Sequence, residues 1–131
     1  MASGINDFLE LELLDHALGI ASWTMPVNVY AHLYTTTLDD TDAGTEVSGG
    51  AYAGTLIAFA TPAAAGSVSS SSDCTFTTAT ASWGTVTDMA IQDAAATTAN
   101  SLFWGALAAS KAVGNGDTFK FNSGDVTCTL T

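Results

Sequence analysis

From residue 26 onward, short apolar segments alternate with clusters of turn-forming residues, and this pattern limits the fold more than any other feature of the sequence. In the segment VNVYAHLYT, one face carries Val27, Val29, Ala31 and Leu33, and the other carries Asn28, Tyr30, His32 and Tyr34. Alternation with a period of two is typical of a strand with one buried face. The segment therefore predicts a strand with one apolar face and one amphipathic, aromatic face.

Six further segments predict strands, and stretches rich in Gly, Asn, Asp and Ser separate them. They are AYAGTLIAFA, DCTFTT, GTVTDMAIQDA, NSLFWGALA, DTFKF and DVTCTLT. NSLFWGALA is apolar on both faces, which favours a central position, and the last two segments predict a terminal hairpin that turns at NSGD. PAAAGSVSSSSD has low complexity and predicts a surface loop. Together these features predict a mainly β chain folded as an antiparallel β-sandwich or jelly-roll-like domain.

One α-helix is expected near the N-terminus, in the segment INDFLELELLDHALG. Asn6 suits the N-cap and Gly19 the position just after the helix, with acidic residues in the first turn. One helical face carries Phe8, Leu11, Leu14 and Leu18, widened by Leu9 and Leu13. A helix with this many apolar residues must pack against another surface, which is either the sheet of its own chain or a neighbouring subunit. We expect residues 1–25 to hold the helix and its connection and residues 26–131 the β-sandwich, in a single folding unit over residues 1–131.

The charge of the chain excludes several kinds of partner. Its 131 residues include 13 acidic and 2 basic side chains, a net charge of −11. Lys111 and Lys120 cannot supply the phosphate contacts that nucleic-acid binding needs, and anionic membrane surfaces are disfavoured for the same reason. We therefore expect neither nucleic acid nor membrane as a partner.

No segment carries a convincing catalytic or cofactor motif. GTEVSGGA has the glycine spacing of a phosphate loop but lacks its lysine, so Gly49 and Gly50 predict a tight turn. His16 and His32 are the only histidines and no nucleophile elbow accompanies them, so we expect no enzyme, no catalytic residue and no cofactor. The acidic loop Asp39–Asp42 departs from the EF-hand pattern; a solvated loop is the favoured interpretation and calcium the alternative.

The two cysteines, Cys74 and Cys128, do not form a zinc pattern, so no metal site is expected. No segment has the basic start and unbroken apolar core of an export signal, which favours reduced thiols. A disulfide stays open as an alternative, because both residues lie in strand-like segments.

Strands rich in Thr and poor in charge favour a surface that pairs with more protein. The candidate contact residues lie on the helix, just after it, and on the aromatic face of the first strand: Leu11, Leu14, Leu18, Trp23, Tyr30, His32 and Tyr34. We expect a homo-oligomer, a trimer or a dimer, formed through such contacts.

Several segments taken in order carry a family resemblance. The series ELELLDHALGIASWTMPVNVYAHLYTT, DAGTEVSGGAYA, ATASWGTVTDMAIQDA, LFWGALAASKAVGNGDTFKF and GDVTCTLT resembles small virion proteins of tailed bacteriophages. Members of this family are often labelled tail-fibre-like or minor structural proteins. The resemblance implies a compact β-rich domain in the virion, displayed on the particle or cementing it, and assembled in the host cytoplasm.

Among virion roles, capsid decoration is the favoured hypothesis, with the chain acting as a cement protein at subunit junctions. The sequence has no long coiled coil or fibrous repeat, so it cannot itself form an extended fibre shaft. Its expected partners are other virion proteins, either the major capsid protein or tail proteins. One alternative is a structural protein of the tail or tail fibre; another is a glycan-binding module for host recognition, with Trp and Tyr stacked on sugar.

Overall fold

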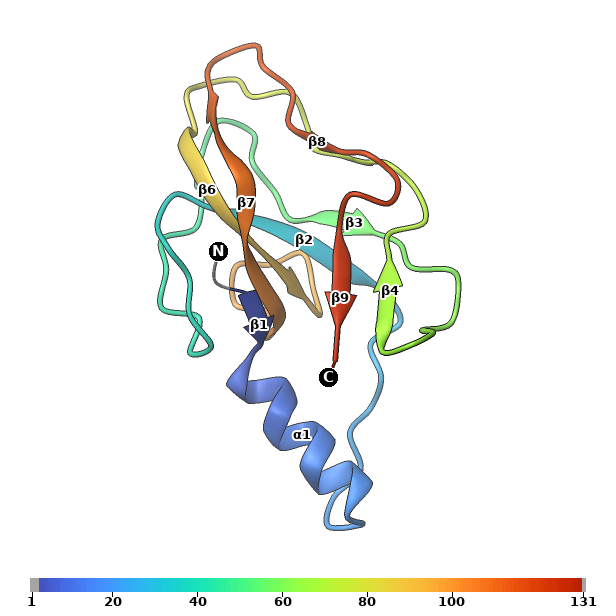
Figure 1. The fold of residues 1–131 in the computed structure, drawn as a ribbon. Helices are drawn as coiled ribbons and strands as arrows, with labels where there is room; N and C mark the ends of the chain where they lie inside the picture. The colour runs from blue at the N-terminus through green and yellow to red at the C-terminus, as the bar shows by residue number, and fades with distance from the viewer. Residues whose placement is uncertain (1–2, 131) are drawn as a thin grey trace.

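The computed structural model describes residues 3–130 and shows a mainly β chain with one helix near its N-terminus (Figure 1). The elements are β1 (Ser3–Ile5), α1 (Asp7–Ala17), β2 (Val29–Tyr34), β3 (Thr55–Ile57), β4 (Ser67–Ser69), β5 (Cys74–Thr75), β6 (Gly84–Gln92), β7 (Ser101–Val113), β8 (Lys120–Phe121) and β9 (Thr127–Thr129). The predicted fold class, mainly β with an N-terminal helix, is confirmed. Within residues 3–130 no helix combines the length and the apolar character needed to cross a membrane.

One five-stranded sheet organises the fold, with the strand order β1-β7-β6-β2-β3 and antiparallel pairing throughout. Leu33 of β2 pairs with Met89 of β6, and Met89 pairs with Gly105 of β7. Strand β7 lies between β1 and β6, so the segment that is apolar on both faces does occupy an interior position. Two small antiparallel sheets, β4-β9 and β5-β8, complete the structure.

The main core lies between one face of the large sheet and the segments that carry the two small sheets, a sandwich-like arrangement. Ala31 and Leu33 of β2 supply the sheet side of this core, where both are fully buried. Phe76 faces them with its ring centroid 5.7 Å from that of Phe119, and Phe119 lies 5.0 Å from Phe121. Edge-to-face contacts of this kind favour one packing of the aromatic rings.

The opposite face of the large sheet is covered by the loop between β2 and β3. Leu38 from this loop is buried against Tyr34 and Ala90. The backbone N–H of Leu38 donates a hydrogen bond of 3.2 Å to Oδ2 of the buried Asp88 on β6. The sheet is therefore covered on both faces by the same chain.

Two expectations about the C-terminal half are wrong. The low-complexity segment predicted as a loop contains β4, whose Val68 pairs with Cys128 of β9. The turn at NSGD does form, since the N–H of Asp125 donates to the carbonyl oxygen of Asn122 at 3.0 Å. Its flanking strands do not pair with each other, because β8 pairs with β5 and β9 with β4. Pairing with strands far earlier in the chain replaces the local hairpin.

The glycine pair that resembles a phosphate loop shapes the backbone instead. Gly49 and Gly50 have φ angles of 73° and 56°, and the N–H of Tyr52 closes the turn on the carbonyl of Gly49 at 2.9 Å. The carbonyl oxygen of Gly50 accepts a hydrogen bond of 2.9 Å from the indole nitrogen of Trp83. The predicted tight turn is confirmed.

A second glycine allows a close approach rather than a turn, and this gives a test of the fold. A side chain at Gly54 would collide with the imidazole ring of His32 and come within 2.9 Å of the carbonyl oxygen of Ala95. We expect Gly54→Ala to lower the free energy of unfolding by about 1–3 kcal/mol, the usual cost of overpacking. Gly114→Ala is the matched control, because its added methyl group would lie 3.5 Å from its nearest neighbour, the carboxylate of Asp117. Urea denaturation of both variants measures the difference, and equal stability would contradict the tight packing.

Candidate interaction surface

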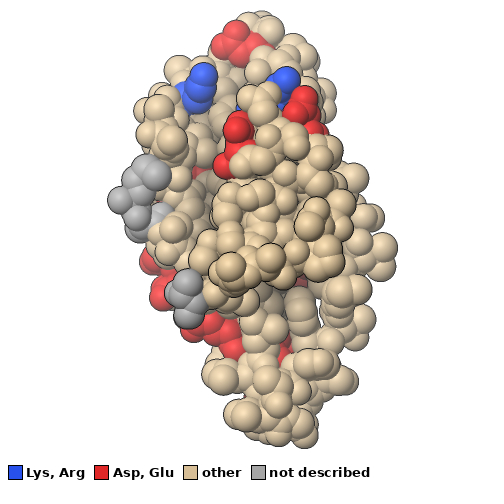
Figure 2. All heavy atoms as spheres, turned by 45° about the vertical axis from the view of Figure 1, so that its right-hand side comes forward, with Lys and Arg blue, Asp and Glu red and all other residues tan. Residues whose placement is uncertain are grey.

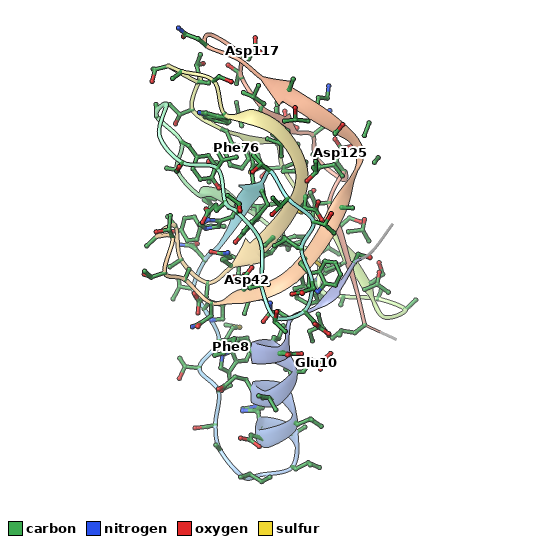
Figure 3. All side chains as sticks on the ribbon, turned by 90° about the vertical axis from the view of Figure 1, so that its left-hand side faces the viewer. Phe8, Glu10, Asp42, Phe76, Asp117 and Asp125 are labelled. Atoms are coloured by element: carbon green, nitrogen blue, oxygen red, sulfur yellow. The ribbon has the colours of Figure 1, made fainter. Side chains whose placement is uncertain are left out.

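Helix α1 is fastened to the sheet at its N-terminal end. The Asn6 side chain accepts a hydrogen bond of 3.1 Å from the N–H of Phe8, and Gly19 follows the helix with φ at 74°. Both predicted helix ends are therefore confirmed. The backbone N–H groups of Asn6 and Asp7 donate to the carbonyl oxygens of Leu102 and Asp40, each at 2.9 Å. Beyond this point the helix extends away from the sheets, with Phe8 and Glu10 at its sheet end (Figure 3).

The predicted leucine stripe faces water. Leu9 is buried, whereas Leu11, Leu14 and Leu18 are 57–70% exposed. Successive helical residues are rotated by about 100°, so Leu9 lies on the side of the helix opposite the stripe. The helix therefore docks on its own chain through Leu9, and the alternative in which the stripe packs on its own sheet is wrong. Contact with a neighbour through Leu11, Leu14 and Leu18 stays a prediction.

The exposed apolar surface continues past the helix. Ile20, Met25 and Val27 are at least 71% exposed. With the leucine stripe they form one apolar protrusion, which we define as residues 7–27. Large exposed apolar patches are uncommon on soluble proteins and usually mark interaction sites. Sequence reasoning singled out neither Ile20 nor Met25, and it placed Val27 on the buried face of the first strand, whereas Val27 precedes β2 and is 95% exposed.

Trp23 belongs to the protrusion but is partly covered. It is half-buried, and its backbone N–H donates a hydrogen bond of 3.2 Å to Nδ1 of His16. His16 lies in the last turn of α1 and is exposed. This contact folds the connection back on the end of the helix. A contact role for Trp23 also stays a prediction.

The expected contact face of Tyr30, His32 and Tyr34 requires a correction. Tyr30 is half-buried, but His32 is 0% and Tyr34 is 3% exposed. The loop between β2 and β3 and the segment around Ala94 cover this face of the sheet. In this chain His32 and Tyr34 are therefore interior residues and are not presented to a partner.

His32 is held by acceptors on both sides of its ring. Its Nδ1 lies 2.5 Å from Oε1 of Glu46, and its Nε2 lies 2.9 Å from the carbonyl oxygen of Ala94. Oε1 of Glu46 also accepts a hydrogen bond of 2.8 Å from the hydroxyl of Tyr52, which in turn accepts one of 2.8 Å from the N–H of Leu33. A buried polar group needs such partners, since leaving one unpaired costs about 1–3 kcal/mol. The network joins β2 to the loop that covers it and leaves the imidazole no free nitrogen for catalysis.

Tyr34 is at the centre of a second buried network. The amide nitrogen of Gln92 donates to the Tyr34 hydroxyl at 2.7 Å and to the Ser101 hydroxyl at 3.0 Å. The Tyr34 hydroxyl donates to Oδ1 of Asp42 at 3.3 Å. Burial, followed by the nearby charge of Asp42, raises the pKa of Tyr34. The phenol is therefore a structural hydrogen-bonding group that ties the acidic loop to the sheet.

The acidic loop uses its first carboxylate internally. Oδ1 of Asp39 accepts hydrogen bonds from the backbone N–H and hydroxyl of Thr41, at 2.9 and 2.7 Å, and from the N–H of Ala43 at 3.3 Å. The Thr41 hydroxyl is the main cause that lowers the pKa of Asp39. No group of three or more acidic, His or Cys side chains within residues 3–130 is arranged to hold a metal ion. The calcium alternative gains no support from this arrangement.

Both cysteines are free thiols in the structure. Cys74 is buried and Cys128 half-buried, and burial raises the pKa of each to about 11. Thiols with such pKa values stay protonated and weakly nucleophilic near neutral pH. They act as small apolar residues in the core.

Comparison with protein families yields one match that spans nearly the whole chain. The family model described as "Podophage GP4 fiber I protein gp80" matches residues 4–129. No curated protein matches this chain.

The two sides of α1 should respond differently to mutation. We expect Leu9→Ala to lower the free energy of unfolding by about 2–4 kcal/mol, the range for a buried leucine. Leu14→Ala should change it by less than about 0.5 kcal/mol, because its side chain faces water. Thermal or urea unfolding measures both values. A larger loss for Leu14→Ala than for Leu9→Ala would reverse the assigned orientation of the helix.

Stability should fall at alkaline pH. The pKa values of Cys74 and Cys128 lie above the unfolded value of 9.0, and burial likewise raises the pKa of Tyr52 above 10.0. The unfolded chain releases these protons first, so the contribution of the two thiols is complete below about pH 9 and is lost as the pH rises towards 11. The contribution of Tyr52 begins to fall only above about pH 10. We expect a loss of roughly 2–5 kcal/mol over this range, measured by urea unfolding. Cys128→Ala should show a shallower loss, and an unchanged slope would contradict the role of this thiol.

Proposed function

Because this chain belongs to the podophage fibre protein family whose model matches residues 4–129, we propose that it is a structural subunit of the phage tail-fibre apparatus. The family match confirms the resemblance to phage virion structural proteins. It supports the tail-fibre alternative better than capsid decoration, the role favoured by the sequence. A β-rich domain without a fibrous repeat suits a component attached to a fibre better than the shaft itself.

The observation that carries this proposal is the apolar protrusion. Its exposed leucines lie along a helix whose first residues are fixed to the rest of the chain by backbone hydrogen bonds. The contact surface is therefore held at a defined distance from the sheets. Burial of apolar surface is the main source of free energy in protein association, at about 25 cal/mol per Å². We propose that this protrusion attaches the domain to another virion protein and that the role is not catalytic.

The glycan-binding alternative has weaker support. Sugar stacking needs aromatic rings at the surface, and Trp83 and Tyr34, which are 4% and 3% exposed, belong to the interior. Trp23 and Tyr30 are half-buried and offer a sugar only part of each ring. The polar groups of the Tyr34 network are already paired with one another. Calorimetry with a panel of glycans tests this alternative, and heat released on binding of any glycan to the protein would support it.

The location in the virion is directly testable. Immunogold electron microscopy of purified particles, with antibody against this chain, should place label on the tail fibres. Label spread over the head would support capsid decoration instead. In phage that carry Leu11→Asp, we expect at least tenfold less of this protein in purified particles, because a charge would be buried in the contact. The matched control is Leu56→Asp, on the exposed face of β3, which should be incorporated normally.

A further inference from the structure

The hydrogen bonds around His32 form a chain whose direction is fixed at both ends. At one end the N–H of Leu33 donates to the hydroxyl of Tyr52 at 2.8 Å. That hydroxyl has accepted one hydrogen, so its own hydrogen points at Oε1 of Glu46, 2.8 Å away. Burial raises the pKa of Tyr52, so the hydroxyl keeps this hydrogen. At the other end the carbonyl oxygen of Ala94, which can only accept, lies 2.9 Å from Nε2 of His32.

The two ends of this chain determine where the hydrogens of the His32 ring lie. Nε2 must carry a hydrogen, because the carbonyl group of Ala94 has none to donate. Oε1 of Glu46 already accepts the hydrogen of Tyr52 and lies 2.5 Å from Nδ1 of His32, so the hydrogen between these two atoms belongs on Nδ1. A neutral imidazole carries hydrogen on one nitrogen only, and both nitrogens donate only in the imidazolium ion. The geometry therefore requires an imidazolium ion opposite a carboxylate.

The carboxylates on this face of the sheet favour the same state. Glu46 contacts the ring itself, and Asp42 accepts the hydroxyl of Tyr34, two residues along β2. The buried Asp88 is the partner of Tyr34 on β6. A buried carboxylate is costly unless a cation or several hydrogen bonds accompany it. A positive charge on His32 meets this need at Glu46, whose side chain is 14% exposed.

The lysines of the chain do not supply that positive charge. Lys111 and Lys120 line a groove together with Met89 and Ile91, core residues on the opposite face of the sheet, and Figure 2 shows both lysines near one end of the visible face. The ion pairs found within residues 3–130 are those of His32 with Glu46 and of Lys120 with Asp73. The imidazolium ion is therefore the counter-charge that the described residues bring to Glu46.

We propose that His32 keeps both ring hydrogens above neutral pH and that the second of them locks the loop after β6 onto the sheet. Residues 93–100 form this loop, and the contact from Nε2 of His32 to Ala94 ties it to β2. When the ring loses one hydrogen, the other stays on Nδ1, because a hydrogen bond to a carboxylate is stronger than one to a carbonyl group. Nε2 then faces the carbonyl oxygen of Ala94 lone pair to lone pair, and the loop releases. The inference does not depend on the fibre role.

The loop held in this way lies beside the returning end of the apolar protrusion. Pro26, Val27 and Asn28, through which the chain enters β2, line a shallow pocket together with Asp93, Ala94 and Ala95. Release of Ala94 removes one wall of this pocket. The proton on His32 should therefore also restrain residues 26–28.

The protonation of the ring is directly measurable, with a second histidine as internal reference. Long-range proton–nitrogen NMR spectra of protein labelled with nitrogen-15 in its two histidines show which ring nitrogens carry hydrogen. At about pH 7.5, one unit above the usual pKa of histidine, we expect His32 to carry hydrogen on both nitrogens. His16, whose Nδ1 accepts the N–H of Trp23 at 3.2 Å, should carry it on Nε2 alone. A single ring hydrogen on His32 at this pH would overturn the proposal.

Two variants test whether Glu46 is the counter-ion. Glu46→Gln removes the charge at similar size, and its amide can donate to Nδ1, so His32 should carry hydrogen on Nε2 alone at about pH 7.5. Asp42→Asn is the matched control, because it removes one carboxylate from the same loop and its oxygen can still accept the hydroxyl of Tyr34. His32 should keep both hydrogens in this control. The same ring state in the two variants would contradict the assignment, and well-dispersed spectra check that both fold.

Hydrogen exchange tests the lock itself. As the pH rises through the point at which the NMR spectra show loss of the second hydrogen of His32, exchange at residues 93–95 should increase at least tenfold beyond the intrinsic effect of pH, and residues 27–28 should follow. Glu46→Gln has the same tyrosines and thiols but a ring that is already neutral, so it should show no such step. Absence of the step in the unaltered protein, or an equal step in Glu46→Gln, would refute the lock.

Discussion

Strand β6 is buried on both faces along most of its length, and much of the remaining structure follows from this constraint. Pairing with β2 and β7 satisfies the N–H and carbonyl groups of its backbone. The side chains on each face of the sheet must still be covered by other parts of the chain. Aromatic side chains such as Phe76 and Phe119 cover one face. The other face is polar, so its cover must supply hydrogen bonds as well as contact. Glu46 and Asp42 do so from the loop after β2, which explains why an acidic loop lies against the sheet.

Local signals predicted the elements better than their partners. Asn6 and Gly19 mark the helix ends because capping depends on residues only a few positions away. Alternation likewise identified β2. The strands β8 and β9 were assigned to each other because they are neighbours in sequence, yet each pairs with a strand far earlier in the chain. Sequence pattern carries little information about such distant pairing.

One question that the sequence left open and one error about surfaces have a common physical origin. Helix α1 is apolar on more than one side, so periodicity could not decide whether Leu9 or the stripe of Leu11, Leu14 and Leu18 faces the sheet. His32 and Tyr34 alternate with apolar residues and so resemble an exposed polar face. Their burial depends on a loop whose path only the fold reveals, and on acceptors such as the carbonyl oxygen of Ala94. Which face meets a partner is therefore a property of the tertiary structure.

The short strand β1 has a mechanical consequence. Within residues 3–130 it spans Ser3–Ile5, and it joins the projecting helix to the edge of the sheet by pairing with β7. A pull on the helix would pass first through this ladder and the backbone hydrogen bonds at Leu102 and Asp40. Force that slides β1 along β7 loads these bonds together, whereas force that lifts β1 from the edge breaks them one by one. The direction of the helix relative to the load would thus decide whether the tether holds or peels.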